Sequence, residues 1–122
     1  MRIIYIEDNP ANVGLMERLA TIGKHEITSY RSGEEALPRI TQGCADLILI
    51  DIQLRGGMDG LELTRQLRAR GVTTPIVAIT AYAMITDREQ CLAAGCDDYI
   101  PKPVSLRALL DKIANFEGRS AG

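Results

Sequence analysis

The chain has 122 residues and a mass of 13.3 kDa, enough for one domain with a proper core and too little for a core plus a separate output domain. Its net charge is −2, and no run of lysine or arginine forms the basic stripe that direct nucleic-acid binding needs. No secretory leader pattern follows Met1 and no apolar run approaches the length of a membrane span, so we expect a cytoplasmic protein that binds neither nucleic acid nor membrane.

The first two predicted elements are a buried strand and a helix. The segment Arg2–Ile6 carries an unbroken apolar run, which is typical of a strand covered by helices on both faces. The run ends in Glu7 and Asp8, so two carboxylates are expected to leave the core at the end of this strand. Asn9-Pro10 supplies a cap and a first-turn proline for a helix that continues to Gly23.

The next elements are predicted to be weaker. His25–Tyr30 is short and more polar, as in an edge strand. Ser32 to Glu35 has the capping-box pattern of a helix start. Pro38 falls inside this helix, where it removes a hydrogen bond at a cost of about 3 kcal/mol, so we expect a short or kinked helix.

The segment Asp46–Asp51 is the most informative of the sequence, because four consecutive large apolar residues run directly into a carboxylate. In a parallel α/β sheet, ligands bind beyond the carboxyl ends of the strands, so Asp51 is aimed at the usual site. An aspartate that only caps a turn is the common alternative. Glu7 and Asp8 favour the functional interpretation, because they leave the core in the same way.

The second half of the chain continues the alternation of strands and helices. A loop at 52–58 leads to a helix that Asp59 caps, and residues 75–80 form another buried run that ends in the hydroxyl of Thr80. A helix is expected at about 84–94.

A short last strand at 98–100 ends at Pro101-Lys102-Pro103, and Ser105 caps a final helix with an apolar face. We expect residues 1–117 to form the domain and residues 118–122 to be a flexible tail or the start of a linker.

The three cysteines, Cys44, Cys91 and Cys96, are odd in number and none has the CxxC spacing. This pattern indicates neither a disulfide framework nor a zinc site. We expect them to be small apolar residues in a reducing compartment.

Five strand-like runs alternate with five helical segments, which predicts right-handed crossovers and a doubly wound parallel α/β sheet with helices on both faces. In the common strand order 2-1-3-4-5, the first and third strands are neighbours and the order reverses between them. This order places Glu7, Asp8 and Asp51 around one crevice. The ends of the fourth and fifth strands bring Thr80 and Lys102 to the same edge.

The residues of this predicted crevice favour phosphoryl chemistry. Three carboxylates repel one another unless a cation joins them, and an oxygen-only cluster suits Mg²⁺. Thr80 adds a hydroxyl donor and Lys102 a compact ammonium group. In this setting the Asp51 carboxylate attacks phosphorus to form an acyl phosphate, while Mg²⁺ and Lys102 neutralise charge on the transferred group.

With these features the sequence resembles the receiver domains of two-component response regulators, whose fold is flavodoxin-like. The resemblance covers the chain from Ile3 to about Phe116, and it is specific because five motifs occur in the order that the family has. The motifs are Ile6-Glu7-Asp8-Asn9, Leu49-Ile50-Asp51-Ile52, Met58-Asp59-Gly60, Ala78-Ile79-Thr80-Ala81 and Asp98-Tyr99-Ile100-Pro101-Lys102-Pro103.

The resemblance implies a role for each residue of the crevice. Asp51 is expected to be the phosphoacceptor, Thr80 the switch hydroxyl and Lys102 the phosphate-sensing cation. A cis Lys102-Pro103 peptide bond is expected to aim the lysine at the phosphate. The expected ligands of Mg²⁺ are Glu7, Asp8, Asp51 and the main-chain carbonyl of Gln53.

The resemblance also implies the partners. The phosphodonor is expected to be a phosphohistidine on a sensor histidine kinase or phosphotransfer protein, which docks over the first helix near Asn12 and Leu15. Phosphorylation is expected to draw Thr80 inward and to let the ring of Tyr99 fill space beneath the fourth helix. A downstream protein or a second copy of the domain would then bind the face made by helix four, strand five and helix five. A static, half-buried Tyr99 is the alternative.

Two departures from the family pattern lie in one loop. Arg55 stands where family members usually have proline, and the loop from Asp51 to Asp59 is one residue longer than usual, with Gly56-Gly57 absorbing the extra residue. We expect a more mobile loop and metal-binding positions that are not displaced.

Other function classes fit the sequence less well. A Mg-dependent phosphatase of the haloacid-dehalogenase type or a Toprim nuclease would need an aspartate where Gln53 stands. A flavin binder would need a glycine-rich or hydroxyl-rich loop in place of Glu7-Asp8. A receiver-like scaffold that is never phosphorylated and an N-terminal receiver excised from a larger regulator are the remaining alternatives. In the favoured interpretation the protein is no enzyme, since it catalyses only its own phosphorylation and dephosphorylation.

Overall fold

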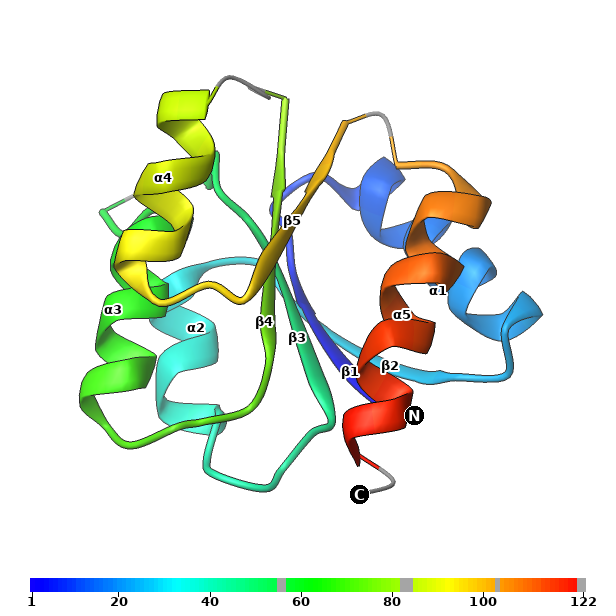
Figure 1. The fold of residues 1–122 in the computed structure, drawn as a ribbon, viewed down its shortest axis with the longest axis horizontal. Coiled ribbons are helices and arrows are strands. Elements are labelled where there is room, and N and C mark those ends of the chain that lie inside the picture. Colours follow the sequence, from blue (N-terminus) through cyan, green and yellow to red (C-terminus); the bar gives the residue numbers. More distant parts are fainter. Residues whose placement is uncertain (55–56, 82–84, 103, 121–122) are drawn as a thin grey trace.

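The computed structural model is a five-stranded parallel sheet between two layers of helices (Figure 1). It describes residues 1–54, 57–81, 85–102 and 104–120, and for residues 85–87 and 117–120 the backbone alone. The strand order is β2-β1-β3-β4-β5, and every neighbouring pair is parallel, as the sequence predicts.

The elements alternate along the described chain. The strands are β1 (Arg2–Ile6), β2 (Glu26–Tyr30), β3 (Leu47–Asp51), β4 (Ile76–Thr80) and β5 (Asp98–Pro101). The helices are α1 (Pro10–Ile22), α2 (Gly33–Ala36), α3 (Gly60–Ala69), α4 (Ile85–Ala94) and α5 (Leu106–Ser120), with a 3₁₀ turn η1 (Leu37–Arg39) after α2. Among these helices, none is both long enough and apolar enough to cross a membrane.

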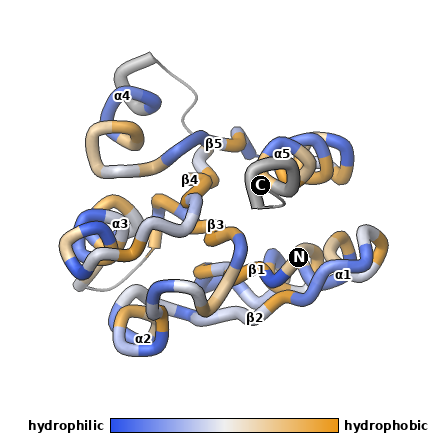
Figure 2. The backbone as a smooth tube through the Cα atoms, turned by 60° about the horizontal axis from the view of Figure 1, so that its bottom comes forward, coloured by the Kyte–Doolittle hydropathy of each residue, from blue (hydrophilic) through white to orange (hydrophobic). Residues whose placement is uncertain are grey.

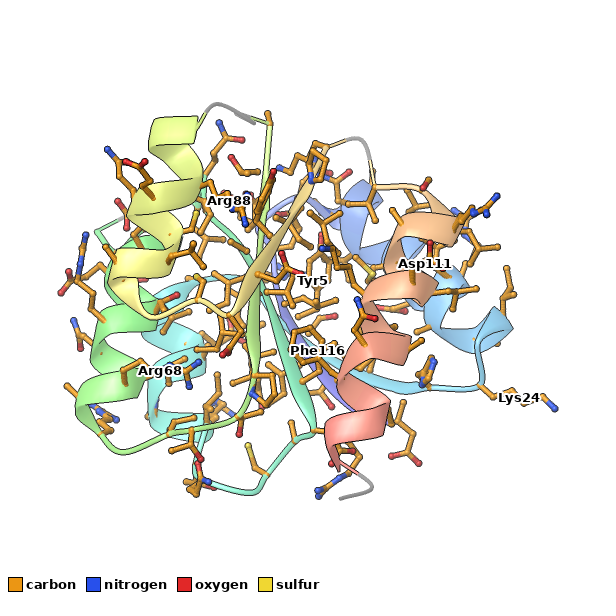
Figure 3. All side chains as sticks on the ribbon, in the orientation of Figure 1. Tyr5, Lys24, Arg68, Arg88, Asp111 and Phe116 are labelled. Carbon is orange, nitrogen blue, oxygen red and sulfur yellow. The ribbon has the colours of Figure 1, made fainter. Side chains whose placement is uncertain are left out.

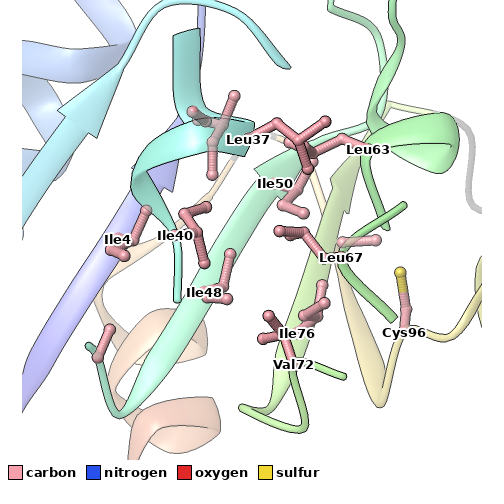
Figure 4. Close-up of a cluster of buried hydrophobic side chains, with 14 of the residues drawn as sticks. Ile4, Leu37, Ile40, Ile48, Ile50, Leu63, Leu67, Val72, Ile76 and Cys96 are labelled. Carbon is pink, nitrogen blue, oxygen red and sulfur yellow. The ribbon is translucent and has the colours of Figure 1, made fainter. Parts of the chain in front are cut away.

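Helices α1 and α5 cover one face of the sheet, and α2, α3 and α4 cover the other (Figures 1 and 2). Alternate residues of each inner strand face opposite layers. In β3, Ile48 and Ile50 belong to the cluster under α2, α3 and α4, whereas Leu47 and Leu49 belong to the cluster under α1 and α5. Figure 4 shows Ile50 beside Leu63 and Leu67 of α3 and Ile48 beside Ile40, among other members of the first cluster.

Strand β3 is buried along its whole length, which explains why its sequence is apolar without alternation. Burying a large aliphatic side chain contributes about 1.5 to 3 kcal/mol, so the four apolar residues of β3 contribute on the order of 10 kcal/mol before conformational entropy is subtracted. This central strand therefore holds its last residue, Asp51, in a fixed position.

Several local predictions are confirmed. Asn9, Ser32, Asp59 and Ser105 each accept a hydrogen bond from a backbone N–H of the helix that follows. The second helix is short, as predicted: α2 ends at Ala36. Pro38 lies in the following 3₁₀ turn η1, because proline has no N–H to continue the α-helical hydrogen bonds.

The C-terminal end of α1 confirms the prediction that Gly23 ends this helix. The helix stops at Ile22 and Gly23 is its cap, and the next residue, Lys24, has the left-handed conformation, with φ of 60°. A Cβ atom on Gly23 would lie 2.8 Å from the His25 ring and 3.0 Å from the Leu110 side chain of α5, so a larger residue would have to displace these two side chains. The side chain of Lys24 is directed into solvent (Figure 3).

The last helix is longer than expected. α5 continues to Ser120, so residues 118–120 have helical backbone where the sequence predicts a loose tail. Phe116, whose side chain is buried under α5, is the last apolar anchor of this helix among the described side chains (Figure 3). The division into a domain and a tail stays a prediction.

Candidate functional site

The carboxyl ends of four strands meet at one edge of the sheet and bring the predicted site residues together. Glu7 and Asp8 follow β1, Asp51 ends β3, Thr80 ends β4 and Lys102 follows β5. One carboxylate oxygen from each of Glu7, Asp8 and Asp51 lies within 4.8 Å of the others. The predicted crevice is therefore present, because β1 and β3 are neighbours in the sheet.

Asp51 is held by contacts from both sides. Lys102 Nζ lies 2.8 Å from Asp51 Oδ2, and the backbone N–H of Gln53 donates to Asp51 Oδ1 at 2.9 Å. The side chain is almost wholly buried, which disfavours ionisation, but hydrogen bonds from the carboxyl of Glu7, the ammonium of Lys102 and the N–H of Gln53 outweigh burial. Together they hold the pKa of Asp51 below its usual value.

The start of α3 approaches the reactive edge closely. A Cβ atom on Gly60 would lie 2.5 Å from the carbonyl oxygen of Asp51 and 2.7 Å from Cα of Ile52. Only glycine fits at this position, which explains the Asp59-Gly60 motif in physical terms. The contact fixes the backbone at Asp51 against α3.

The pKa of the Glu7 carboxyl group is strongly raised in this site. It is 1% exposed, and burial together with a hydrogen bond to Asp51 raises the pKa of Glu7 to about 7, against a hydrogen bond from Asn12 that lowers it. Asn12 Nδ2 donates to Glu7 Oε1 at 2.5 Å, whereas Oε2 is buried with no hydrogen-bond donor among the described residues. Below about pH 7, a proton on Glu7 that is shared with Asp51 reduces the repulsion between the two carboxylates.

The same arrangement suits a hard divalent cation. The cluster offers carboxylate oxygens and no nitrogen or sulfur, and one of these oxygens, Glu7 Oε2, has no donor to satisfy it. Mg²⁺ takes oxygen ligands in this way and keeps several waters. Glu7, Asp8 and Asp51 could therefore hold such an ion in place of the shared proton.

Thr80 and Tyr99 lie on neighbouring strands beside the crevice. Thr80 is 3% exposed, and its carbonyl oxygen accepts a hydrogen bond from the Lys102 N–H at 2.8 Å. Tyr99 is half-buried on the edge strand β5, and the guanidinium carbon of Arg88 on α4 lies 5.8 Å from the centre of its ring (Figure 3). This cation–π contact links α4 to β5.

Sequence reasoning missed part of the site. Asn12 enters it through the first turn of α1, where its amide reaches back to Glu7, and only its position five residues after a strand-ending acid hints at this contact. Tyr5 lies beneath the acids. Burial is the main cause of the strongly raised pKa of Tyr5, and the charges of Glu7, Asp51 and Asp8 raise it further.

A cavity of about 330 Å³ lies between α1 and the start of the α5 layer. It is lined by Tyr5, Asn12, Leu15, Met16, Leu19, Ile79, Lys102 and Val104.

Two of the sequence predictions fall outside the described residues. The Lys102-Pro103 peptide bond involves residue 103, and the altered loop involves residues 55 and 56. Both stay predictions.

The sequence matches the model of the response regulator receiver domain over residues 3–114. It is 37% identical over 120 residues to the polar-differentiation response regulator DivK of Brucella ovis, with 95% of each chain covered. It is 35% identical to the sensor protein GacS of Pseudomonas syringae pv. syringae, over 96% of this chain and 13% of that protein. The chain thus spans a small part of the sensor proteins that it matches, and 47% of the transcriptional regulatory protein TcrA of Mycobacterium tuberculosis, to which it is 34% identical.

Solved structures resemble the whole chain. A two-component response regulator from Clostridium difficile superposes with a TM-score of 0.90 at 28% identity, over 100% of this chain and 99% of that one. The receiver domain of the sensor histidine kinase PA1611 from Pseudomonas aeruginosa PAO1 gives a TM-score of 0.85 at 34% identity, over 96% and 97% of the two chains. In that structure a magnesium ion is coordinated in the active-site cleft.

The replacement Glu7→Gln is expected to stabilise the protein at alkaline pH when divalent cations are absent. The pKa of Glu7 is about 7 in the folded protein and has its ordinary value of 4.5 in the unfolded chain, so the folded state binds more protons between these two pH values. The free energy of unfolding of the wild type therefore falls across this window, by an amount on the order of 3 kcal/mol. Urea denaturation with a chelator at about pH 5 and about pH 8 would measure this fall, which Glu7→Gln should remove.

Glu26→Gln, at an exposed position of β2, is the matched control and should leave the pH dependence unchanged. A Glu7→Gln variant that is less stable than the wild type at about pH 8 would contradict the raised pKa of Glu7.

Proposed function

Because this chain belongs to the response regulator receiver domains of two-component systems, we propose that Asp51 is the residue that accepts the phosphoryl group. Receiver domains are signalling domains and not enzymes with separate substrates. The observation that carries the proposal is the position of Asp51 at the end of β3, with the ammonium of Lys102 at 2.8 Å and two further carboxylates beside it.

The proposed transfer is a displacement at phosphorus. One carboxylate oxygen of Asp51 forms a bond to phosphorus, the bond from phosphorus to the imidazole nitrogen of the donor breaks, and the electron pair remains on that nitrogen. Asp51 is suited to attack because its lowered pKa keeps it ionised at neutral pH. Lys102 gives up its contact with Asp51 Oδ2 and binds an oxygen of the new phosphoryl group, where its charge is needed.

We propose Mg²⁺ as the cofactor of this step. Its ligands would be carboxylate oxygens and the main-chain carbonyl of Gln53, and the oxygen-only cluster supports this choice. When bound, the ion supplies positive charge that offsets the negative charge of the transferred group. The magnesium ion in the cleft of the PA1611 receiver domain is consistent with this assignment.

The donor is proposed to be a phosphohistidine on a sensor histidine kinase or a phosphotransfer protein, docked over α1. Leu15 is 45% exposed on this helix although it is a large apolar residue. Gly14 lies beside it, and an added Cβ atom there would meet no described atom within 4 Å. A glycine inside a helix costs about 1 kcal/mol relative to alanine, and the packing of this chain does not require it. A partner that approaches the α1 backbone closely would explain both features.

The output is proposed to be a change of packing on the face formed by α4, β5 and α5. Thr80 would move toward the phosphoryl oxygens, and Tyr99 would turn into the space that this movement leaves, which requires its contact with Arg88 to be remade. Converting a 1:99 mixture of the two states into 99:1 needs about 5.5 kcal/mol of differential interaction. Hydrogen bonds to a charged group contribute about 1.5 to 3 kcal/mol each, so Thr80 and Lys102 together would supply most of it. A downstream protein or a second copy would bind the altered face.

The proposal predicts that a small phosphodonor such as acetyl phosphate labels the chain once, in the presence of Mg²⁺, and that Asp51→Asn abolishes the label. Intact-mass measurement would count the phosphoryl groups, and addition of a chelator should suppress labelling. Asp111→Asn, at an exposed position of α5, is the matched control and should be labelled like the wild type (Figure 3). Label that persists in Asp51→Asn would refute the assignment.

Leu15→Asp is expected to slow transfer from a phosphohistidine protein by about tenfold or more, the equivalent of ~1.4 kcal/mol, because it places a charge in the proposed docking surface. Labelling by acetyl phosphate should be unchanged, since the small donor does not need α1. Leu92→Asp offers a matched control, because Leu92 is exposed to the same degree, 44%, but lies on α4. Equal rates for the two variants would place the docking surface elsewhere.

Thr80→Ala is expected to leave phosphorylation intact and to remove its effect on α4 and β5, while Thr80→Ser, which keeps the hydroxyl, should retain the effect. Amide and Tyr99 ring signals with and without a phosphate mimic such as beryllofluoride would report the change over residues 88–101. Signals that do not respond in the wild type would leave Tyr99 as a static aromatic residue.

A further inference from the structure

The last turn of α4 ends in a motif that brings two cysteines together. The N–H of Gly95 donates to the carbonyl of Leu92 at 3.1 Å, and the N–H of Cys96 donates to the carbonyl of Cys91 at 3.0 Å. Gly95 has φ of 116°. These bonds define a Schellman motif, in which the side chains of the two residues joined by the longer bond pack against each other. Cys91 and Cys96 are those two residues.

The hydrogen bond between the two cysteines limits how far apart they lie. The nitrogen of Cys96 is 3.0 Å from the carbonyl oxygen of Cys91. Covalent geometry adds about 1.5 Å from the nitrogen to its Cα and about 2.4 Å from the oxygen to its Cα. The two Cα atoms are therefore at most about 7 Å apart. They lie closer when the two Cα atoms and the hydrogen bond are not on one line. A disulfide requires a Cα–Cα distance of about 4.4 to 6.8 Å.

Both thiols are enclosed by the same apolar cluster. Cys91 is 3% exposed and Cys96 5% exposed, and Figure 4 shows Cys96 at the margin of the cluster. Burial raises the pKa of Cys96 to about 11, with a further contribution from the neighbouring Cys91 and an opposing one from Thr64. Thr64 Oγ1 lies 3.8 Å from Cys96 Sγ, and its own hydroxyl donates to the carbonyl of Gly60 at 2.8 Å.

Arg68 of α3 holds the backbone on both sides of Cys96. Its Nε donates to the carbonyl of Gly95 at 3.0 Å, and one terminal nitrogen binds the carboxylate of Asp97 at 2.9 Å (Figure 3). The other terminal nitrogen binds the carbonyls of Val72 and Thr74 at 2.8 and 2.9 Å. The backbone turn that carries Cys96 is thus held in place before any reaction occurs.

We propose that Cys91 and Cys96 form a modification site at which a peroxide produces an intramolecular disulfide. One thiolate attacks the O–O bond of hydrogen peroxide, which gives a sulfenic acid and hydroxide. The sulfur of the second cysteine then attacks the sulfenic sulfur, so that the S–S bond forms and the second oxygen leaves as water. In sum, two thiols and one peroxide give one disulfide and two waters.

The burial of the pair sets the rate of this reaction. A pKa of about 11 for Cys96 leaves little of it as thiolate at neutral pH, so oxidation through this sulfur should accelerate about tenfold for each pH unit between 7 and 9. A small, uncharged oxidant is needed to enter the cluster. This inference extends the sequence-based expectation that the cysteines are only small apolar residues, and it does not depend on phosphorylation.

The test uses the folded full chain, treated with millimolar hydrogen peroxide and then denatured, alkylated and weighed. The expected product takes up one alkyl group, whereas the reduced chain takes up three; its mass before alkylation is lower by about 2 Da, and no dimer forms. Cys44→Ser is the matched control, because Cys44 lies outside the motif and is half-buried; this variant should form the same disulfide. Cys91→Ala and Cys91→Ser should both fail to form the bridge, and circular dichroism should show that both variants remain folded.

Three outcomes would overturn the proposal. The first is a folded wild type that retains all three thiols, the second is a bridge that includes Cys44 or a second chain, and the third is a bridge that forms only after denaturant is added. A disulfide that forms in the folded wild type and in Cys44→Ser, but in neither variant of Cys91, supports it.

Discussion

Electrostatic repulsion among the carboxylates of Glu7, Asp8 and Asp51 is the constraint on which the working edge of this molecule depends. β1 and β3 are hydrogen-bonded neighbours, so their ends cannot separate without breaking the sheet, and the acids are held within 4.8 Å of one another. The protein offsets the repulsion with a raised pKa on Glu7 and with the ammonium of Lys102. Burial of the strands stabilises the fold and offsets the destabilisation that the repulsion causes at this edge of the sheet. Such a trade-off between stability and activity is common at functional sites.

The parts of this structure that the sequence predicts are those that depend on local pattern and on topology. β3 was identified by its four apolar residues because a strand covered on both faces excludes polar side chains. Caps and the effect of Pro38 were predictable because each depends on the chemistry of one residue and its nearest turn. The grouping of Glu7, Asp8 and Asp51 followed from the strand order alone, since parallel strands end at one edge.

Contacts between side chains distant in sequence were not predictable. Apart from their spacing of five residues, the sequence does not indicate that Asn12 donates to Glu7. It does not indicate that Arg68 binds both Gly95 and Asp97 either, because such pairs depend on how helices sit on the sheet. The left-handed conformation of Lys24 after α1 was not predictable either, because glycine is the residue that adopts this conformation most readily.

The contacts of Arg68 have a mechanical consequence for α4. They attach the C-terminal end of this ten-residue helix to α3, whereas the other end follows the strand that carries Thr80. A helix of ten residues is about 15 Å long, so a turn of about 10° around the attached end would displace its opposite end by about 2.6 Å. In the proposed switch, α4 would turn about a point near Gly95. A small movement of Thr80 would then produce a displacement of the helix that is largest near Ile85 and smallest beside the two cysteines.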